Sequence, residues 1–166
     1  MNKMKRNALI LVVLAIVLTS CNIGKSNKAE IQEEIKEVEK LTTEEVPYVV
    51  AKNYYVLNTV KNDKVESLRI TSQDNFESYF GTAATMGEQG TPTSIDFKKS
   101  FVLALVGQPT DKDTSFEIKE LVAKGDVLEL SYTIKQSQEN RSFTVHPCII
   151  LVVDKTNEKD VRFIAE

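Results

Sequence analysis

The sequence predicts a mainly β fold, an antiparallel sandwich or a barrel-like sheet with one short helix; an α+β arrangement is the alternative. Short segments rich in β-branched, aliphatic and aromatic residues follow one another along residues 47–166, separated by turn residues. One segment among them carries helix signals. Strands joined by consecutive hairpins pack naturally into an antiparallel sandwich or barrel.

Two strands are predicted in the first half of this region. Tyr48–Asn58 is rich in β-branched and aromatic residues, and Val65–Ile70 is a weaker segment of the same kind. The polar residues 61–64, Lys-Asn-Asp-Lys, are typical of a turn. We therefore expect two strands joined by a short connection.

A helix is predicted directly after the second strand. Thr71 or Ser72 can cap its first turn, Asp74 suits the positive end of the helix dipole, and Gly81 ends it. The helix carries an aromatic face formed by Phe76, Tyr79 and Phe80. Such a face is usually part of a core, so we interpret it as packing and not as a cofactor site.

The second half contains five predicted strands: Phe101–Val106, Ser115–Ala123, Val127–Lys135, Cys148–Val153 and Val161–Ile164. The first is a continuous apolar run, which predicts a strand covered on both faces. In the second, the alternation slips near Glu120, which indicates a β-bulge. Lys124-Gly125-Asp126 predicts a hairpin turn.

The third of these strands alternates cleanly between apolar and polar residues. An alternation of period two separates the two faces of a strand. We therefore expect one face to point inward and the other outward. The inward set is Leu128, Leu130, Tyr132 and Ile134; the outward set is Glu129, Ser131, Thr133 and Lys135.

The first twenty residues have the order of a secretory signal peptide. Residues 1–7 carry three positive charges, and Ala8–Leu18 is a run of eleven apolar residues. As a helix this run reaches about 17 Å, against roughly 30 Å of hydrocarbon in a bilayer. Leu18-Thr19-Ser20-Cys21 resembles the lipobox of bacterial lipoproteins, which implies cleavage before Cys21 and lipid on its thiol. An unlipidated cleaved signal and an uncleaved anchor are the alternatives.

The chain is thus expected to have three parts. Residues 1–20 are a lipoprotein signal peptide, residues 21–46 are the lipidated cysteine and a charged stalk, and residues 47–166 are a single β-rich globular domain. Ala29–Leu41 has apolar residues at helical spacing, as in a solvated stalk helix or a docking helix. The expected location is the cell envelope, anchored to the outer or cytoplasmic membrane and facing the periplasm or the exterior, because two or three acyl chains hold a protein stably on a bilayer.

Composition excludes several classes of partner. The net charge is −3, and removal of three positive leader residues leaves 18 basic against 24 acidic residues, about −6. This balance argues against nucleic acid and against electrostatic docking on an acidic membrane surface. With lipid on Cys21, Cys148 has no cysteine left to pair with in the chain, so no disulfide is expected.

No motif indicates an enzyme or a cofactor. His146 and Cys148 could share a face of an extended segment as a thiol–imidazole pair, but Cys148 opens an apolar run, which favours a buried thiol. Asp111 and Asp113 lack the further oxygen ligands and the glycine of a calcium loop. We therefore predict no metal site and no catalytic residues.

The long loop Thr82–Asp96 supplies an alternative function. It holds three turn residues, Gly87, Gly90 and Pro92, among small polar residues, without the pattern of a phosphate-binding loop. Together with Tyr54 or Tyr55 it could bind a small molecule or a glycan. A carrier lipoprotein is therefore the alternative hypothesis.

The second half of the chain resembles a known family. The segments are Ile95–Phe97, Phe101–Thr110, Ser115–Ile118, Gly125–Leu130 and His146–Val152. Over roughly residues 95–164 they are similar to the PrcB C-terminal-like domain, first named from a lipoprotein that stabilises a surface protease complex of a spirochaete. The rest of the mature chain resembles uncharacterised lipoproteins of Bacteroides-type bacteria.

This resemblance implies a small β domain that binds another envelope protein, such as a protease or its complex. In the family a Pro-Thr-Gly-Gly-Tyr-like turn, similar to the loop of chagasin-type cysteine-protease inhibitors, joins two strands. Pro109, Thr110 and Phe116 match its ends, while the stretch from Asp111 to Ser115 replaces its glycines. The candidate partner-binding loop is Gln108, Pro109, Thr110, Asp111, Asp113 and Phe116.

Overall fold

The computed structural model describes residues 43–83 and 90–166. The predicted leader, Cys21, most of the stalk with its predicted helix, and residues 84–89 of the long loop lie outside the described residues. In the part of the chain that is described, no helix has the length and apolar character needed to cross a bilayer.

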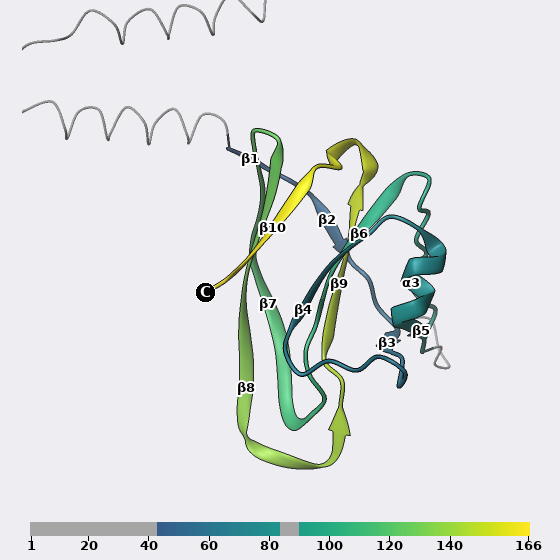
Figure 1. The fold of residues 1–166 in the computed structure, drawn as a ribbon, viewed down its shortest axis with the longest axis vertical. Helices are drawn as coiled ribbons and strands as arrows, with labels where there is room; N and C mark the ends of the chain where they lie inside the picture. The colour runs from purple at the N-terminus through teal and green to yellow at the C-terminus, as the bar shows by residue number, and fades with distance from the viewer. Residues whose placement is uncertain (1–42, 84–89) are drawn as a thin grey trace, which may run out of the picture. The chain divides into compact units, whose positions relative to one another are not determined.

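The domain is mainly β with one short helix, which confirms the predicted class (Figure 1). Sheet A has the strand order β1-β7-β8-β10, and sheet B has the order β2-β9-β6-β4. The strands of sheet A are Thr43–Glu45, Thr110–Lys124, Val127–Val145 and Asp160–Ala165. Those of sheet B are Tyr48–Val50, Cys148–Asp154, Ser100–Val106 and Glu66–Ile70.

A third, two-stranded sheet C pairs β3 (Tyr54–Val56) with β5 (Phe80–Thr82), and helix α3 spans Gln73–Tyr79. A single 3-10 turn, η1 (Lys155–Asn157), joins β9 to β10. The strand pairs are antiparallel except β8–β10, which is parallel. The sheets form layers and are not closed into a barrel.

The main core lies between sheets A and B. Side chains from β6 and β9 of sheet B pack against side chains from β7 and β8 of sheet A, so both inner faces are buried from solvent. The fully or nearly buried members are Val46, Phe101, Leu103, Leu121, Ala123, Leu128, Leu130, Leu151 and Val153.

The opposite face of sheet B is covered by α3 and sheet C. Alternate residues of β6, Val102, Ala104 and Val106, pack there against Phe76 and Phe80. The rings of Phe76 and Phe80 lie 5.0 Å apart between centroids. The strand is therefore covered on both faces, as its continuous apolar run predicts, and the aromatic face of the helix is core packing.

The helix begins as predicted but ends differently. The hydroxyl of Ser72 caps the first turn by accepting a hydrogen bond from the Asn75 amide at 3.4 Å. The last helical residue is Tyr79, and Phe80 already has extended backbone angles. Gly81 lies in β5, where the Tyr55 ring packs over it, so its role is close packing and not helix termination.

The predicted strand Tyr48–Asn58 is in fact two strands in different sheets. Asn53 adopts a φ of 63°, a left-handed conformation that asparagine tolerates better than most residues. This turns the chain between β2, which joins sheet B, and β3, which joins sheet C. The predicted strand at Val65–Ile70 is confirmed as β4.

The long hairpin β7–β8 confirms two predictions and corrects two. The register shifts between Ile118 and Glu120, as expected for a bulge, and Gly125 turns the chain with a φ of 59°. Ile134, expected to point inward, is 45% exposed because it lies beyond the edge of the core. Glu129, on the outward face, is buried because Lys124 and Arg162 pair with its carboxylate.

Residues 43–46, assigned from sequence to the end of the stalk, lie within the folded unit. Strand β1 pairs with the end of β7, from Thr43 opposite Lys124 to Glu45 opposite Val122. Val46 is 2% exposed and belongs to the main core. The chain therefore enters the domain at the end of the sandwich that holds the β7–β8 turn (Figure 1).

Candidate functional site

The candidate partner-binding segment is mostly strand and not loop. Only residues 107–109 connect β6 to β7, and Gln108 and Pro109 are exposed there. From Thr110 onward the chain is in β7, paired with β8. A strand forms because β8 continues ten residues past its predicted end at Lys135, to Val145, and supplies a partner. The prediction that Asp111 and Asp113 lie in a loop was wrong, because β7 begins at Thr110.

Phe116 is part of the core, so little of its side chain is accessible to a partner. It is 8% exposed and clusters with Leu105 and Tyr132. The rings of Phe116 and Tyr132 are 6.1 Å apart at an interplanar angle of 65°. The candidate segment thus divides into a buried end at Phe116 and an exposed end that includes Asp111 and Asp113.

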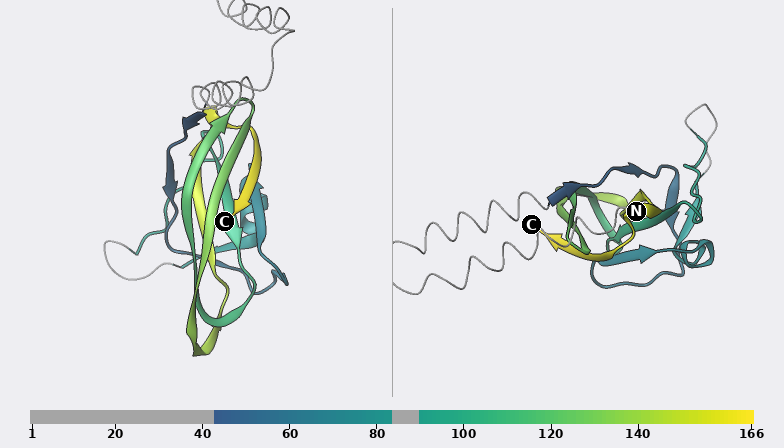
Figure 2. Two further views of the ribbon diagram at one scale, coloured as in Figure 1. Left: turned by 90° about the vertical axis from the view of Figure 1, so that its left-hand side faces the viewer. Right: turned by 90° about the horizontal axis from the view of Figure 1, so that it is seen from above.

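The exposed ends of β7 and β8 form a two-stranded extension, here called the arm, comprising residues 110–115 and 135–145. The arm reaches beyond the strands of sheet B at the end opposite the β7–β8 turn (Figures 1 and 2). Its pairing is irregular, with Lys112 opposite Asn140 and Thr114 opposite Gln136. Three positive and three negative side chains lie on it, so it has no net charge.

Side-chain bonds hold the irregular part of the arm together. The Asp113 amide donates to the Ser137 hydroxyl at 3.2 Å, and that hydroxyl donates to the Glu139 carbonyl at 2.9 Å. An ion pair joins Asp113 to Arg141 at 2.6 Å. These contacts link both strands where the regular ladder is interrupted.

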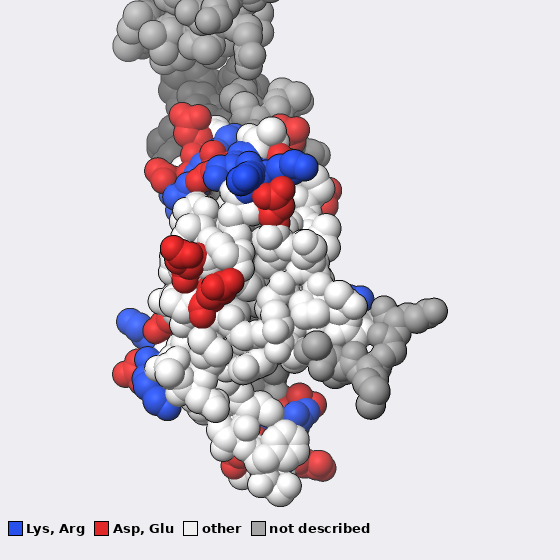
Figure 3. Space-filling view, turned by 90° about the vertical axis from the view of Figure 1, so that its right-hand side faces the viewer, with Lys and Arg blue, Asp and Glu red and all other residues white. Residues whose placement is uncertain are grey.

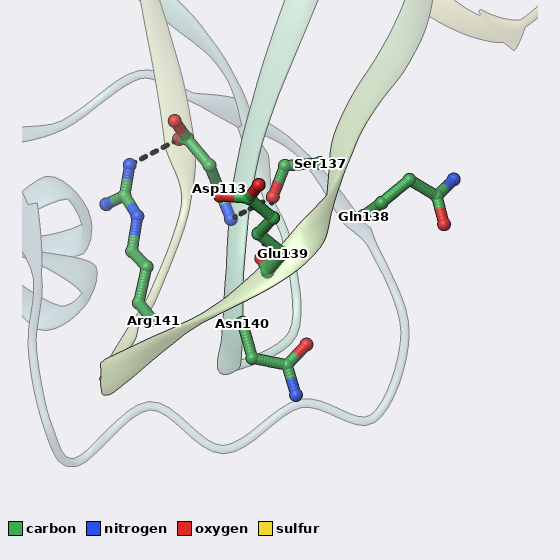
Figure 4. Close-up of a pocket in the computed structure, with 6 residues that line it drawn as sticks. All are labelled: Asp113, Ser137, Gln138, Glu139, Asn140 and Arg141. Carbon is green, nitrogen blue, oxygen red and sulfur yellow. Dashed lines mark hydrogen bonds and ion pairs between the residues drawn. The ribbon is translucent and has the colours of Figure 1, made fainter.

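Arg141 also connects the ion pair to an exposed aromatic ring. Its guanidinium lies 5.5 Å from the centroid of Phe143, which is 57% exposed. An open hollow of about 420 Å³ lies beside the ion pair (Figure 4). It is lined by Asp113, Ser137, Gln138, Glu139, Asn140 and Arg141, all polar.

The base of the arm is held by Asn62. Its side-chain amide donates to the carbonyls of Lys64, Val106 and Gly107 at 2.7, 3.2 and 3.1 Å. These three acceptors fix the orientation of the amide, so its oxygen faces His146 Nε2 at 2.8 Å. Because that oxygen only accepts, Nε2 carries a hydrogen.

The arrangement around Cys148 does not resemble an activated thiol. Cys148 is opposite Val106 in sheet B and packs against the cluster under α3. Burial raises the pKa of its thiol to about 11. The Nε2 of His146 is engaged by Asn62. At neutral pH the sulfur is therefore a protonated thiol packed as an apolar group.

The described part of the predicted ligand loop is hydrogen-bonded to residues near β3. The Tyr54 hydroxyl donates to the Thr93 carbonyl at 2.7 Å, and the Asn53 side chain donates to the Thr91 carbonyl at 3.1 Å. Tyr54 therefore has a structural role, whereas Tyr55 is 48% exposed. The face that carries α3 and sheet C has few charged groups across its middle (Figure 3).

Sequence reasoning missed Asn62, Arg141 and Phe143. The polar run from Gln136 to Ser142 has no alternation of apolar residues from which a strand could be recognised. Asn62 lies in a polar segment that is typical of a turn. In the described ranges, no three His, Cys, Asp or Glu side chains gather as metal ligands. No protein-family model, curated protein or solved structure matches the chain. The resemblance to the PrcB C-terminal-like family stays a prediction.

Proposed function

We propose that this chain is a lipid-anchored envelope protein that acts as a protein-interaction module, with the arm as its contact surface. The observation that carries the proposal is the position of the arm. The chain enters the domain at Thr43, opposite Lys124 at one end of β7, and the arm lies at the other end of that strand of 15 residues. A strand of this length spans roughly 45–50 Å. The arm therefore lies far from the point where the chain enters the domain.

The residue types on the arm suit a protein contact. Arginine and aromatic side chains contribute a large share of binding energy at interfaces. Arg141 is held by Asp113 and by the ring of Phe143, so less rotamer entropy is lost when a partner binds. A binding role also agrees with the raised pKa of Cys148, which leaves little thiolate for catalysis.

For the partner we propose another envelope protein, a protease or its complex in particular. This part rests on the sequence resemblance and on the expected location. The balanced charge of the arm favours a partner surface that offers both an apolar pocket for Phe143 and a carboxylate for Arg141. No net attraction to nucleic acid is expected from such a surface.

Affinity capture from cross-linked envelopes tests the proposal. The wild-type chain should recover a defined partner, and Phe143→Ala with Arg141→Ala should reduce its yield at least tenfold, about 1.4 kcal/mol of binding free energy. Tyr55→Ala is the matched control, because it removes another exposed ring, on sheet C. Equal recovery by both variants would exclude the arm, and recovery of no partner by the wild type would exclude an interaction module.

A carrier for a glycan or small molecule is the second candidate. The open polar hollow beside Asp113 and the exposed ring of Tyr55 are the features that favour it. A ligand that binds only the folded state raises the melting temperature, and the effect grows logarithmically with the free ligand concentration relative to its dissociation constant. A thermal-shift screen with oligosaccharides should then give a shift that Asn140→Ala or Tyr55→Ala abolishes; no shift with any sugar excludes this candidate for sugars.

A further inference from the structure

The outer edge of β8 is only half covered. Strand β10 pairs with β8 from Val127 to Tyr132, and the Glu166 amide donates to the Tyr132 carbonyl at 2.9 Å. Strand β8 nevertheless continues in regular pairing with β7 as far as Gln136. Among the residues that the structure describes, no strand covers the outer side of β8 from Thr133 onward.

The backbone groups at this edge can be assigned from the alternation of the strand. Because the Tyr132 carbonyl faces β10, the N–H and C=O groups two and four residues later face the same side. These belong to Ile134 and Gln136, both exposed. The groups of Thr133 and Lys135 face β7. The edge therefore offers two donors and two acceptors in the spacing that an extended chain pairs with.

The side chains flanking this edge differ on its two faces. Ile134 is opposite Phe116 and continues the apolar surface of Phe116 and Tyr132, yet it is 45% exposed. On the other face, Lys135 and Lys119 both pair with Glu117, at 2.6 and 3.3 Å, which leaves one positive charge in excess. Lys135 is still 67% exposed as a side chain.

We propose that this edge of β8 receives an extended segment of a partner protein, added to sheet A in line with β10. The segment is apolar beside Ile134 and acidic beside Lys135, because these choices bury the isoleucine and balance the extra lysine. Strand addition of this kind takes its affinity from backbone hydrogen bonds and its specificity from alternate side chains. The inference rests on the proposed interaction function and names the chemistry of the partner.

The same edge has features that disfavour nonspecific pairing with strands of other molecules. Exposed lysines and irregular register are devices that keep edge strands from aggregating. The regular run ends at Gln136, since the register shifts between Thr114 and Lys112 on the opposite strand. A short edge of this kind accepts a segment with matching side chains and discourages extended pairing between flat sheets.

Two synthetic peptides of about ten residues, one alternating valine with glutamate and one alternating valine with lysine, are the probes. Gln136→Pro removes an outward-facing N–H without removing a bond to β7. Gln136→Ala is the matched control, because both changes lose the side-chain bond to Thr114 but only the proline loses the N–H. Binding to the mature chain is measured by fluorescence anisotropy, with hydrogen exchange of the Ile134 and Gln136 amides.

The acidic peptide should bind at least tenfold more tightly than the basic one, lose at least tenfold in affinity with Gln136→Pro and keep its affinity with Gln136→Ala. Lys135→Glu should reverse the preference between the peptides, which provides a test if the proline variant fails to fold. No binding by either peptide, equal binding by the proline and alanine variants, or a wild-type dimer that Gln136→Pro dissolves would each overturn the proposal. Envelope capture separates the two proposals. If Phe143→Ala with Arg141→Ala loses the partner while Gln136→Pro keeps it, the proposed function stands and only the binding at this edge is refuted.

Discussion

At the residue scale, the side chain of Asn62 joins the connection before β4 to the end of β6 and to the segment before β9. Three carbonyls accept from its amide and His146 donates to its oxygen, so its full hydrogen-bonding capacity is nearly used.

Asn62→Ala should lower the free energy of unfolding by about 2 kcal/mol, because it leaves partly buried carbonyls and the His146 ring without partners. Urea denaturation measures this change. Asn58→Ala, at an exposed position of the same region, is the control and should change stability by less than about 0.5 kcal/mol. Equal effects of the two substitutions would contradict the role assigned to Asn62.

His146 should make stability depend on pH. Burial lowers its pKa below the ordinary value of 6.5, and Lys61 acts in the same direction, while a hydrogen bond to the Gly107 backbone and the charge of Glu66 oppose them. The unfolded chain therefore binds a proton more readily than the folded domain. The contribution of His146 is fully present above its unfolded pKa and is lost as the pH falls from there through the folded pKa.

His146→Gln keeps a side-chain donor for Asn62 but does not titrate. Denaturation between about pH 7 and pH 5.5 should show a steeper loss of stability for the wild type than for the variant, because His146 is the single histidine of the chain. Parallel curves would show that burial does not perturb this ring in the folded domain.

At the element scale, two glycines differ in what surrounds them. A Cβ at Gly107, in the connection between β6 and β7, would lie 2.8 Å from Cγ of Pro147 and 3.3 Å from Cζ of Phe116. A Cβ at Gly81 would lie 2.6 Å from Cζ of Tyr55, the far end of an exposed side chain. The first contact meets packed groups, and the second meets a ring that can turn away.

Gly107→Ala should therefore cost about 1–3 kcal/mol of unfolding free energy, the usual range for overpacking. Gly81→Ala should cost less than about 1 kcal/mol, because movement of the Tyr55 ring relieves the contact. Thermal denaturation of both variants compares them directly. A larger loss for Gly81→Ala would mean that the Tyr55 ring is fixed in place.

The elements that the sequence predicted correctly are those whose burial produces a recognisable pattern of apolar residues along the chain. Strands β6 and β9 are continuous apolar runs because both faces of sheet B are covered, and the bulge near Glu120 appears as a slip in alternation. The arm has no such signal, since neither face of residues 136–144 is buried. The division at Asn53 and the parallel placement of β10 depend on contacts distant in sequence, which composition cannot reveal.

At the scale of the whole molecule, the entry point of the chain and the candidate contact residues lie at opposite ends of the β7–β8 hairpin. The chain enters the domain beside the turn at Gly125, and the candidate contact residues lie at the other end. A hydrogen bond from Asn62 to the Gly107 carbonyl lies at the base of the arm, and the Asp113–Arg141 ion pair joins its two strands. The candidate partner-binding residues predicted from sequence include Thr110, Asp111 and Asp113 of one strand of this arm, because the resemblance pointed there.

The proposed lipid anchor can be tested with the two cysteines as a matched pair. Cys21→Ser should move the protein from the membrane to the soluble fraction and remove the acyl mass from its N-terminus, because no other covalent lipid site is expected. Cys148→Ser is the control: it changes the second thiol, inside the cluster under α3, and should leave the protein on the membrane. Burying a hydroxyl there should lower the melting temperature, since serine packs less well among apolar side chains than a thiol. If Cys21→Ser still sediments with membranes, another segment must hold the chain at the bilayer, and the proposed lipid anchor on Cys21 is refuted.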